Sequence, residues 1–286
     1  MIDLLPQFLF NGLLIGASYA LIAVGLTMIF GIMNIANFAH GQLYMLGGCL
    51  GYFLTARLGL HYLLTVPLVV LVVMALGLLL ERTIFRRLRY EPAMSSVLAT
   101  VGLAILLENA ARVLWGPQPE PIATGFSQMP IQLGPVFTTE ARVFAVVTTF
   151  GALLLVYLFL NRSLLGTAMR ATFQQSEAAA LVGISIDKVH AATFALGAGL
   201  AALGGVLLGA IFFVYPTMGT TATLKAFIVV ILGGLGSIGG SVVGGLILGL
   251  AESLGTLVSS AYKDAIGFVL VILILLYRPD GLFKRS

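Results

Sequence analysis

Long apolar runs, separated by short groups of charged residues, make up most of this chain. The first run, from Leu4 to Ala56, extends over 53 residues without Asp, Glu, Lys or Arg. Because a helix needs about 20 apolar residues to cross a bilayer, this run is long enough for two helices. Further charge-free runs cover Leu58 to Leu80, Pro92 to Leu107, Val143 to Asn161, Val189 to Leu224, Ala226 to Ala251 and Ala265 to Tyr277. Together they predict an all-α polytopic membrane protein with about eight to nine membrane-crossing or re-entrant helices, in a single transmembrane domain over residues 1–286.

Two polar or glycine-rich segments interrupt these runs, one near each end of the chain. Residues 31–41 contain Asn34, Asn37 and His40, and residues 233–241 contain five glycines and two serines. Paired interruptions of this kind indicate discontinuous helices at the repeat interface of a transporter. The first segment is equally compatible with an ordinary turn between helices. For the second a re-entrant or broken helix fits better, because residues 225–235 give only about 16 Å of helix.

The composition excludes a soluble globular domain. Hydrophobic residues make up 59% of the chain and charged residues 9%, against about 25% charged residues in soluble domains. The mean hydropathy of +1.08 indicates that lipid surrounds most of the protein. The first apolar run follows Asp3 and is far too long for a signal peptide, so we expect the first helix to stay in the mature protein. The single cysteine, Cys49, cannot form an intrachain disulfide.

Basic residues predict the orientation, because Lys and Arg accumulate in cytoplasmic loops. Residues 116–140 carry five prolines and two acidic side chains and are expected to form the main loop on the opposite side. Counting helices backwards then places the N-terminus outside and the C-terminus in the cytoplasm. The three basic clusters are Arg82, Arg86, Arg87 and Arg89; Arg162, Arg170 and Lys188; and Arg278, Lys284 and Arg285.

Nucleotide-binding and catalytic motifs lack the context that they need. Gly234, Gly236 and Gly239 match the spacing G-x-G-x-x-G, but apolar helices flank them where a strand and a soluble βαβ unit are required. No Gly-Lys-Ser/Thr occurs in the chain, so any ATP must be bound by another subunit. The three histidines are far apart, and no H-E-x-x-H or cysteine cluster exists. We therefore expect no catalytic, cofactor-binding or metal-binding residues and no enzymatic activity.

Charged residues inside the apolar runs are candidate functional residues, since a charge at membrane depth is costly. Glu108 and Arg112 lie four residues apart on one helix face, where mutual neutralisation is the common interpretation and gating the alternative. Lys225 and Glu252 are less easily paired. Glycines also recur every four residues, a spacing that lets helix backbones approach closely in lipid. They are Gly236, Gly240 and Gly244, and Gly245 and Gly249.

The loop of residues 162–188, with basic residues at both ends, contains an amphipathic segment that we interpret as a cytoplasmic docking segment. Ser176 can cap a short helix there, and Glu177 lies at the positive N-terminal end of that helix. Such a helix presents a small apolar ridge that fits a groove on a partner. A helix lying on the membrane surface is the alternative. The ridge comprises Ala178, Ala179, Leu181 and Val182.

The spacing of Glu177-Ala178-Ala179 and Gly183 resembles the coupling loop of ATP-binding-cassette importer permeases, although the usual downstream Ile-x-Leu-Pro is absent. Four separated stretches, one of which contains this motif, widen the resemblance to essentially the whole chain. Residues 31–48, 177–205 and 233–249, with the terminal Arg278-Pro279-Asp280-Gly281-Leu282-Phe283, are similar to the shorter subunit of the branched-chain amino acid permease family. The resemblance implies a permease subunit in the bacterial cytoplasmic (inner) membrane.

The same resemblance implies the partners and the mechanism. The importer would contain a homologous second permease chain, two cytoplasmic ATPase subunits and a periplasmic or extracellular substrate-binding protein that delivers leucine, isoleucine or valine. The ATPases would bind the ATP and pull on the coupling loop, so that adjacent helices tilt and the pathway alternates between inward-open and outward-open. The residues expected to couple to the ATPases are Ser176, Glu177, Ala178, Ala179 and Gly183.

The translocation pathway is expected to have a small, weakly polar lining that does not hold cargo tightly. Urea or short amides are alternative cargoes within the same family. An ion-coupled secondary transporter is less compatible, because the long runs lack mid-helix Asp, Glu or His. A passive channel would need a second asparagine-centred segment, and residues 233–241 contain no asparagine. The candidate pathway residues are Asn34, Asn37, Gly236, Ser237 and Gly239.

Overall fold

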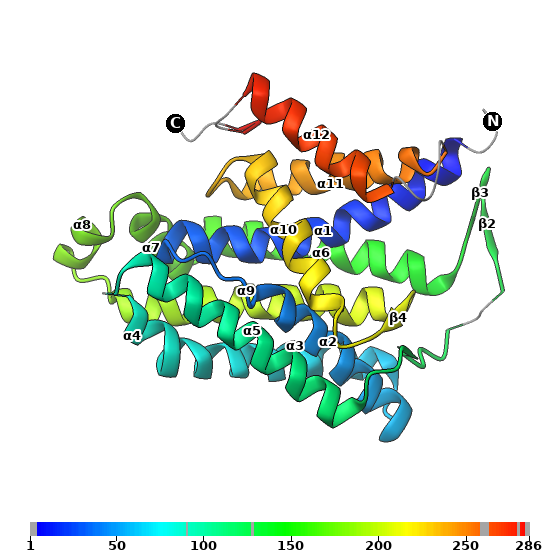
Figure 1. Ribbon diagram of the computed structural model, residues 1–286, viewed down its shortest axis with the longest axis horizontal. Helices are drawn as coiled ribbons and strands as arrows, with labels where there is room; N and C mark the ends of the chain where they lie inside the picture. The colour runs from blue at the N-terminus through cyan, green and yellow to red at the C-terminus, as the bar shows by residue number, and fades with distance from the viewer. Residues whose placement is uncertain (1–4, 90, 127–128, 258–262, 279–280, 284–286) are drawn as a thin grey trace.

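The computed structural model describes residues 5–89, 91–126, 129–257, 263–278 and 281–283 (Figure 1). Six helices in these ranges are long and apolar enough to cross a membrane, and two shorter apolar helices accompany them. The chain is therefore an all-α polytopic membrane protein, as the run lengths predict. The long helices are α1 (Leu5–Met33), α3 (Tyr62–Leu80, extended by η3 Glu81–Phe85 and α4 Arg86–Leu88), α5 (Ala93–Trp115), α6 (Glu140–Arg162), α9 (Ile186–Gly209) and α11 (Ile238–Gly255).

The remaining elements are short. They are the helices α2 (His40–Tyr52, continued by η2 Phe53–Arg57), α7 (Leu164–Gln174), α8 (Ser176–Leu181), α10 (Met218–Gly233) and α12 (Lys263–Tyr277), and four strands. Strand β1 (Glu120–Pro121) pairs antiparallel with β4 (Phe213–Val214), and β2 (Ile131–Leu133) pairs antiparallel with β3 (Val136–Thr138).

The most buried spans are α1 and α9, which lie at the centre of the bundle, whereas only 22% of the residues in an 18-residue apolar stretch of each of α5 and α6 are buried. The exposed residues on the outer helices are large and apolar, for example Leu106 on α5 and Leu155 on α6. In water such a surface would aggregate, but in a bilayer it meets lipid of its own polarity. The fold is thus built around a central pair of helices with an apolar periphery.

Glycine lets the central helices cross at backbone contact. Helix α1 packs on α11, where a Cβ added at Gly245 would lie 2.7 Å from the backbone nitrogen of Ala20. A Cβ at Gly249 would overlap the backbone of Gly16 in the same crossing. The four-residue glycine spacing of α11 therefore serves close helix approach, as the sequence predicts.

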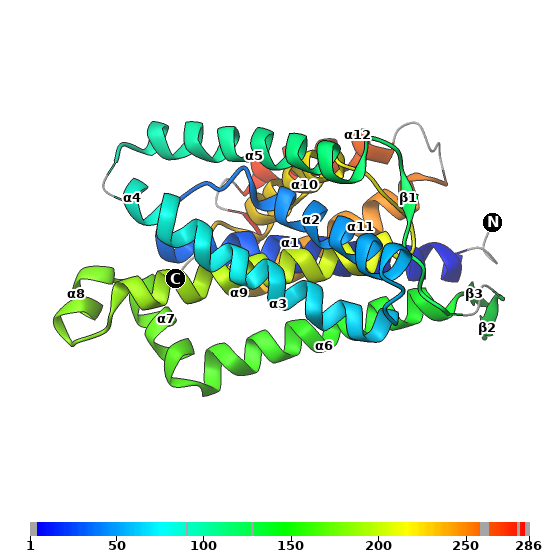
Figure 2. The ribbon, with the colours of Figure 1, turned by 90° about the horizontal axis from the view of Figure 1, so that it is seen from below.

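Both predicted interruptions are breaks in helices. Helix α1 ends at Met33, residues 34–39 return without helical structure into the interior of the bundle, and α2 begins there (Figures 1 and 2). Helix α10 ends at Gly233, and residues 234–237 turn the chain into α11. The starts of α2 and α10 meet, since the amide of Gly41 donates to Oγ1 of Thr223 at 3.1 Å.

The charged and the proline-rich segments lie at opposite ends of the molecule. Helices α4, α7 and α8, which carry or adjoin the first two basic clusters, gather at one end, while the start of α1 and strands β2 and β3 lie at the other (Figure 1). Lys284 and Arg285 of the third basic cluster lie outside the described residues. The first two basic clusters therefore lie at the end of the molecule opposite the β2–β3 hairpin.

Candidate functional site

The short helices α7 and α8 end in a turn at Gly183. Helix α7 begins after Ser163, whose Oγ accepts a hydrogen bond from the Gly166 amide at 2.9 Å. In α8 the N-cap position is Gln175, with no side-chain cap, and Ser176 is the first helical residue, so the predicted capping role of Ser176 is wrong. The Ile184 amide donates to the Ala179 carbonyl at 3.1 Å, and Gly183 has φ +88°. This is a helix C-terminus that requires the left-handed conformation, which glycine adopts without strain.

The tip of α8 exposes apolar side chains at the polar end of the molecule. Leu181 is 89% and Val182 is 78% exposed, and Glu177 and Ala178 are exposed beside them. Ala179 is only 4% exposed because it faces inward, so it does not belong to the predicted ridge. Leu181 and Val182 therefore form a contiguous apolar tip on α8.

The first break uses both of its asparagines to shape the backbone. Asn34 has φ +53°, the one positive φ among the described non-glycine residues. Its backbone N–H donates to the Phe30 carbonyl at 2.8 Å. Asn37 is fully buried, and its Oδ1 accepts a hydrogen bond from the Ala39 amide at 3.0 Å. A spacing of three would place the two side chains on one face of a helix, but Asn34 is exposed and Asn37 is buried, so they do not share a face. The reason is that residues 34–39 are not helical, so a spacing of three does not align side chains.

The second break is a tight turn closed by side chains and by the C-terminal segment. Gly236 has φ +85°, and Ser237 is the N-cap of α11, where its Oγ accepts from the Gly240 amide at 3.0 Å. The amides of Leu282 and Phe283 donate to carbonyls at the end of α10, at 2.9 and 3.2 Å. The terminal Gly-Leu-Phe motif therefore satisfies carbonyls that the helix end leaves free.

Gly236 and Gly239, which the sequence groups together, differ in their surroundings. A Cβ on Gly236 would lie 2.9 Å from the ring of Phe173, whereas a Cβ on Gly239 would meet nothing within 4 Å. Gly239 therefore has room for an alanine side chain, because its backbone is helical and the space around it is open, whereas Gly236 does not.

Phe173 of α7 lies between the two breaks. A Cβ on Gly31, near the end of α1, would lie 2.8 Å from Cδ2 of the Phe173 ring and 3.5 Å from the Cα of Gly236. The ring therefore touches both interruptions. In the chain, two residues separate Phe173 from the start of α8. Sequence reasoning missed Phe173, since a single aromatic in an amphipathic segment gives no signal of its contacts.

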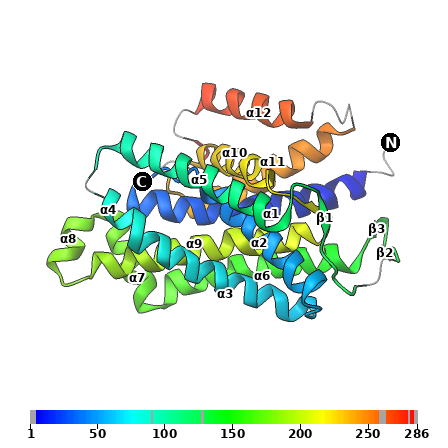
Figure 3. The same ribbon diagram turned by 60° about the horizontal axis from the view of Figure 1, so that its bottom comes forward.

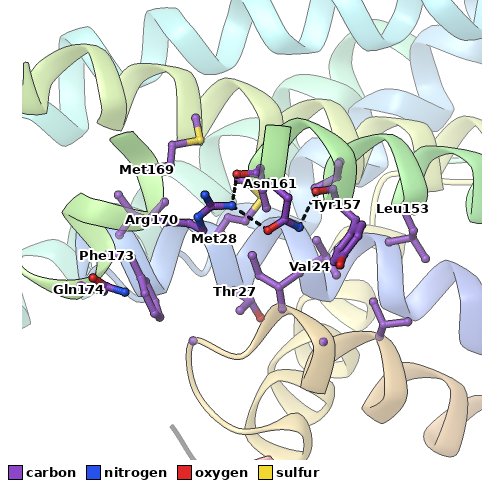
Figure 4. A pocket seen from close by; sticks show the side chains of 17 residues that line it. Val24, Thr27, Met28, Leu153, Tyr157, Asn161, Met169, Arg170, Phe173 and Gln174 are labelled. Atoms are coloured by element: carbon purple, nitrogen blue, oxygen red, sulfur yellow. Dashed lines mark hydrogen bonds between the residues drawn. The ribbon is translucent and has the colours of Figure 1, made fainter. Parts of the chain in front are cut away.

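A cavity of about 490 Å³ opens beside this contact, between α1, α6, α7 and the start of α11 (Figure 4). Its wall is mainly apolar, and its polar side chains include Asn161 and Arg170, whose Nη1 donates to the Asn161 Oδ1 at 2.7 Å. Gly236 and Gly239 line it, whereas Asn34, Asn37 and Ser237 do not. The second break, the last turns of α1 and helix α7 therefore share one cavity at the basic end.

The charged residues of the spans are paired. Lys225 on α10 forms an ion pair with Glu252 on α11, both buried, and the Tyr19 hydroxyl donates to Glu252 Oε2 at 2.9 Å. Glu108 and Arg112 form the predicted pair on α5, with Nη2 and Oε1 2.6 Å apart. The Lys225 pair joins residues 27 apart in sequence, so no helical spacing predicts it. Within the described ranges no three His, Cys, Asp or Glu side chains are placed to hold a metal ion.

Comparison with known proteins places this arrangement among transport proteins. Residues 8–275 match the family described as "Branched-chain amino acid transport system / permease component". The high-affinity branched-chain amino acid transport system permease protein LivH of Escherichia coli (strain K12) is 37% identical, over 98% of this chain and 95% of LivH. The corresponding protein BraD of Pseudomonas aeruginosa is 38% identical over the same shares. A probable LivH of Methanocaldococcus jannaschii is 28% identical over 98% of this chain and 93% of its own.

Proposed function

Since the chain belongs to the branched-chain amino acid permease family, we propose that it is the shorter permease subunit of an ATP-binding-cassette importer for leucine, isoleucine and valine. A homologous second permease chain completes the translocation pathway, and a periplasmic or extracellular binding protein delivers the cargo. Two cytoplasmic ATPase subunits bind the ATP, in keeping with the absence of a Gly-Lys-Ser/Thr motif from this sequence. This chain contributes transport and no enzymatic step.

The exposed tip of α8 is the observation that carries the ATPase assignment. Leu181 and Val182 project from the basic end of the molecule, next to Glu177 and Ala178. Helix α8 is short and rigidly ended by Gly183, so it suits a groove on a soluble partner. We place the end of the molecule that carries α4, α7 and α8 in the cytoplasm and the N-terminus outside, because Lys and Arg accumulate in cytoplasmic loops.

Phe173 connects helices α7 and α8, which the ATPases would move, to the two helix breaks. When the ATPases close, they displace α8 and with it α7, whose Phe173 ring contacts the backbone at both helix breaks. At a break, a helix can tilt without losing hydrogen bonds in its interior. A movement of the Phe173 ring therefore tilts the helices at the breaks and rearranges the translocation pathway. Gly236, Gly239 and Ser237, with Asn34 and Asn37, are the residues around which this rearrangement takes place.

Uptake by a reconstituted complex tests the proposal. Proteoliposomes that contain this chain, its partner subunits and internal ATP should accumulate leucine, isoleucine and valine in the presence of the binding protein. The cargo panel includes urea and acetamide, and accumulation of these in place of the amino acids would overturn the cargo assignment. Accumulation driven by an ion gradient without ATP would overturn the whole proposal.

Crosslinking tests the docking surface separately. A cysteine at Ala178 or Leu181 should form crosslinks to an ATPase subunit, because both positions are exposed on α8. A cysteine at Gln132, exposed in the β2–β3 hairpin at the opposite end, is the control. Capture of the ATPase from Gln132 and from neither α8 position would refute the assignment.

A further inference from the structure

Two carboxylates and two arginines from distant parts of the chain meet where α4 lies beside the start of α9 (Figure 3). Glu81 begins η3, the turn that follows α3, while Arg86 begins α4 and Arg89 follows it. Asp187 lies in the first turn of α9. Gly183, at the end of the coupling segment, is only four residues earlier in the chain. Any displacement of α8 is therefore passed directly to the residue that contacts the arginines.

Glu81 is fully enclosed, and its carboxylate is only loosely paired. The side chain is 0% exposed, and neither carboxylate oxygen has a hydrogen-bond partner within the described part of the chain. Nη2 of Arg89 is 3.7 Å from Oε1, and Nη2 of Arg86 is 3.9 Å from Oε2. Buried polar atoms are nearly always hydrogen-bonded, and a half-satisfied buried charge is costly. The carboxylate therefore has unused capacity to bind both arginines.

Asp187 holds the same two arginines more closely. Nη1 of Arg89 donates to its Oδ1 at 2.7 Å, and Nη1 of Arg86 lies 3.7 Å from its Oδ2. The Asp187 side chain is 50% exposed, so water can solvate it when the arginines leave, whereas Glu81 is enclosed. The distances from Arg89 to the two carboxylates, 2.7 and 3.7 Å, differ by only 1.0 Å. The guanidinium groups are therefore shared between two carboxylates and need only a small shift to exchange one for the other.

The backbone around the cluster can supply a shift of this size. Residues Glu81–Phe85 form a π-helical turn, and helices bend at such turns. The buried rings of Phe85 and Phe194 have their centroids 4.4 Å apart and join this turn to α9. Phe194 is seven residues beyond Asp187, about 10 Å along the helix, so a tilt of about 10° about the ring contact moves Asp187 by about 2 Å. Helix shifts of about 1–2 Å are typical of switching proteins.

We propose that Arg86 and Arg89 are positioning residues that form a switch, binding Asp187 before the ATPases close on ATP and Glu81 afterwards. In the first arrangement the ion pairs attach the start of α9 to α4. When the ATPases displace α8, Asp187 moves away with the start of α9, and Glu81 binds the two arginines in the interior. The exchange keeps the buried charge compensated throughout the movement. The inference rests on the proposed function and adds the contact that resists the ATP-driven change.

Neutral variants of the two carboxylates distinguish a switch from a structural ion pair, because a switch makes them act in opposite directions. Asp187→Asn weakens the first arrangement and should raise ATP hydrolysis without the loaded binding protein about two- to fivefold, the range for a partly exposed ion pair. Glu81→Gln weakens the second arrangement and should lower the stimulation by the loaded binding protein several-fold, while hydrolysis without that protein stays low. Asp187→Glu keeps the charge and should behave like the wild type.

Arg87→Gln is the matched control for these measurements. Arg87 is exposed on α4 between the two arginines of the switch and takes part in none of these ion pairs, so its variant should keep wild-type hydrolysis and uptake. If Asp187→Asn and Glu81→Gln change hydrolysis in the same direction, or if neither changes it, the four side chains only stabilise the fold and the switch is refuted.

A distance measurement tests the movement with all four side chains in place, so it does not depend on the folding of the Glu81 variant. Spin labels are attached to Arg87→Cys and Lys188→Cys, two exposed neighbours of the switch, in the complete transporter with Cys49→Ala. The distance between the labels should lengthen when the complex is trapped with ATP and vanadate. An unchanged distance in a complex that accumulates leucine would refute the switch and leave the proposed function standing. A wild-type complex that accumulates no amino acid would refute the proposed function itself.

Discussion

Replacing Gly31 by alanine tests whether the ring of Phe173 couples the ATPases to the helix breaks. The new methyl group would lie 2.8 Å from Cδ2 of the ring and closer still to Cε2, where ordinary contact begins at 3.4 Å. Relief at Cδ2 alone requires a shift of 0.6 Å, the difference between 3.4 and 2.8 Å, and the closer Cε2 requires a larger one. Gly236 limits that movement, because the ring also lies against its backbone.

The size of this clash predicts that Gly31→Ala folds but couples ATP hydrolysis poorly to transport. Overpacking of this kind costs about 1–3 kcal/mol, and the displaced atoms are the far end of a side chain that can swing toward the adjacent cavity. In proteoliposomes we expect Gly31→Ala to retain ATP hydrolysis and to lower the number of leucine molecules taken up per ATP hydrolysed. Gly151→Ala is the matched control, because a Cβ at that helical glycine of α6 meets nothing within 4 Å.

A double-mutant cycle identifies the ring as the cause. In a Phe173→Ala background the methyl group at residue 31 has no ring to displace, so its effect on thermal stability in detergent should disappear. Residues in contact show interaction free energies of about 0.5–3 kcal/mol. Purely additive effects of Gly31→Ala and Phe173→Ala would refute the contact, and an unchanged uptake per ATP in Gly31→Ala would refute its part in coupling.

Three further changes have definite expected results. A cysteine at Gln132 should react with an impermeant reagent added outside cells and one at Arg87 only after permeabilisation; the reverse pattern would invert the topology. Lys225→Met should lower stability by about 3–5 kcal/mol by leaving Glu252 buried and unpaired, and adding Glu252→Gln should restore most of it in a thermal denaturation assay. Gly239→Ala should change stability by less than about 0.5 kcal/mol and leave uptake intact, and a large loss of uptake would show a direct part in transport.

The sequence predicts the class of fold and the positions of the breaks because both depend on local properties. Run length alone identifies the spans, and clustered glycine and polar residues identify the interruptions. The Glu108 and Arg112 pair is also local, since a spacing of four aligns side chains on a helix. What a residue touches inside its own helix could therefore be predicted.

Contacts between distant segments could not be predicted in this way. Lys225 and Glu252 meet because α10 packs on α11 and on α1, and nothing in the spacing of an all-round apolar helix tells which side faces which neighbour. Gly236 and Gly239 look equivalent in sequence, yet only Gly236 has a positive φ and an aromatic ring beside it. A spacing of three would place Asn34 and Asn37 on a common face only if residues 34–39 were helical, and they are not.

Helix α10 connects the second helix break to α5. Its last turn leads into Gly236, which contacts Phe173, and its first turn carries Thr220, whose hydroxyl donates to Glu108 on α5. A helix of 16 residues moves nearly as a rigid body, so a tilt imposed at one end displaces the other. The buried pair of Lys225 with Glu252 lies between these ends and attaches α10 to α11. Because that attachment lies near the middle of α10, we expect a tilt imposed at the Gly236 end to displace Thr220 in the opposite direction.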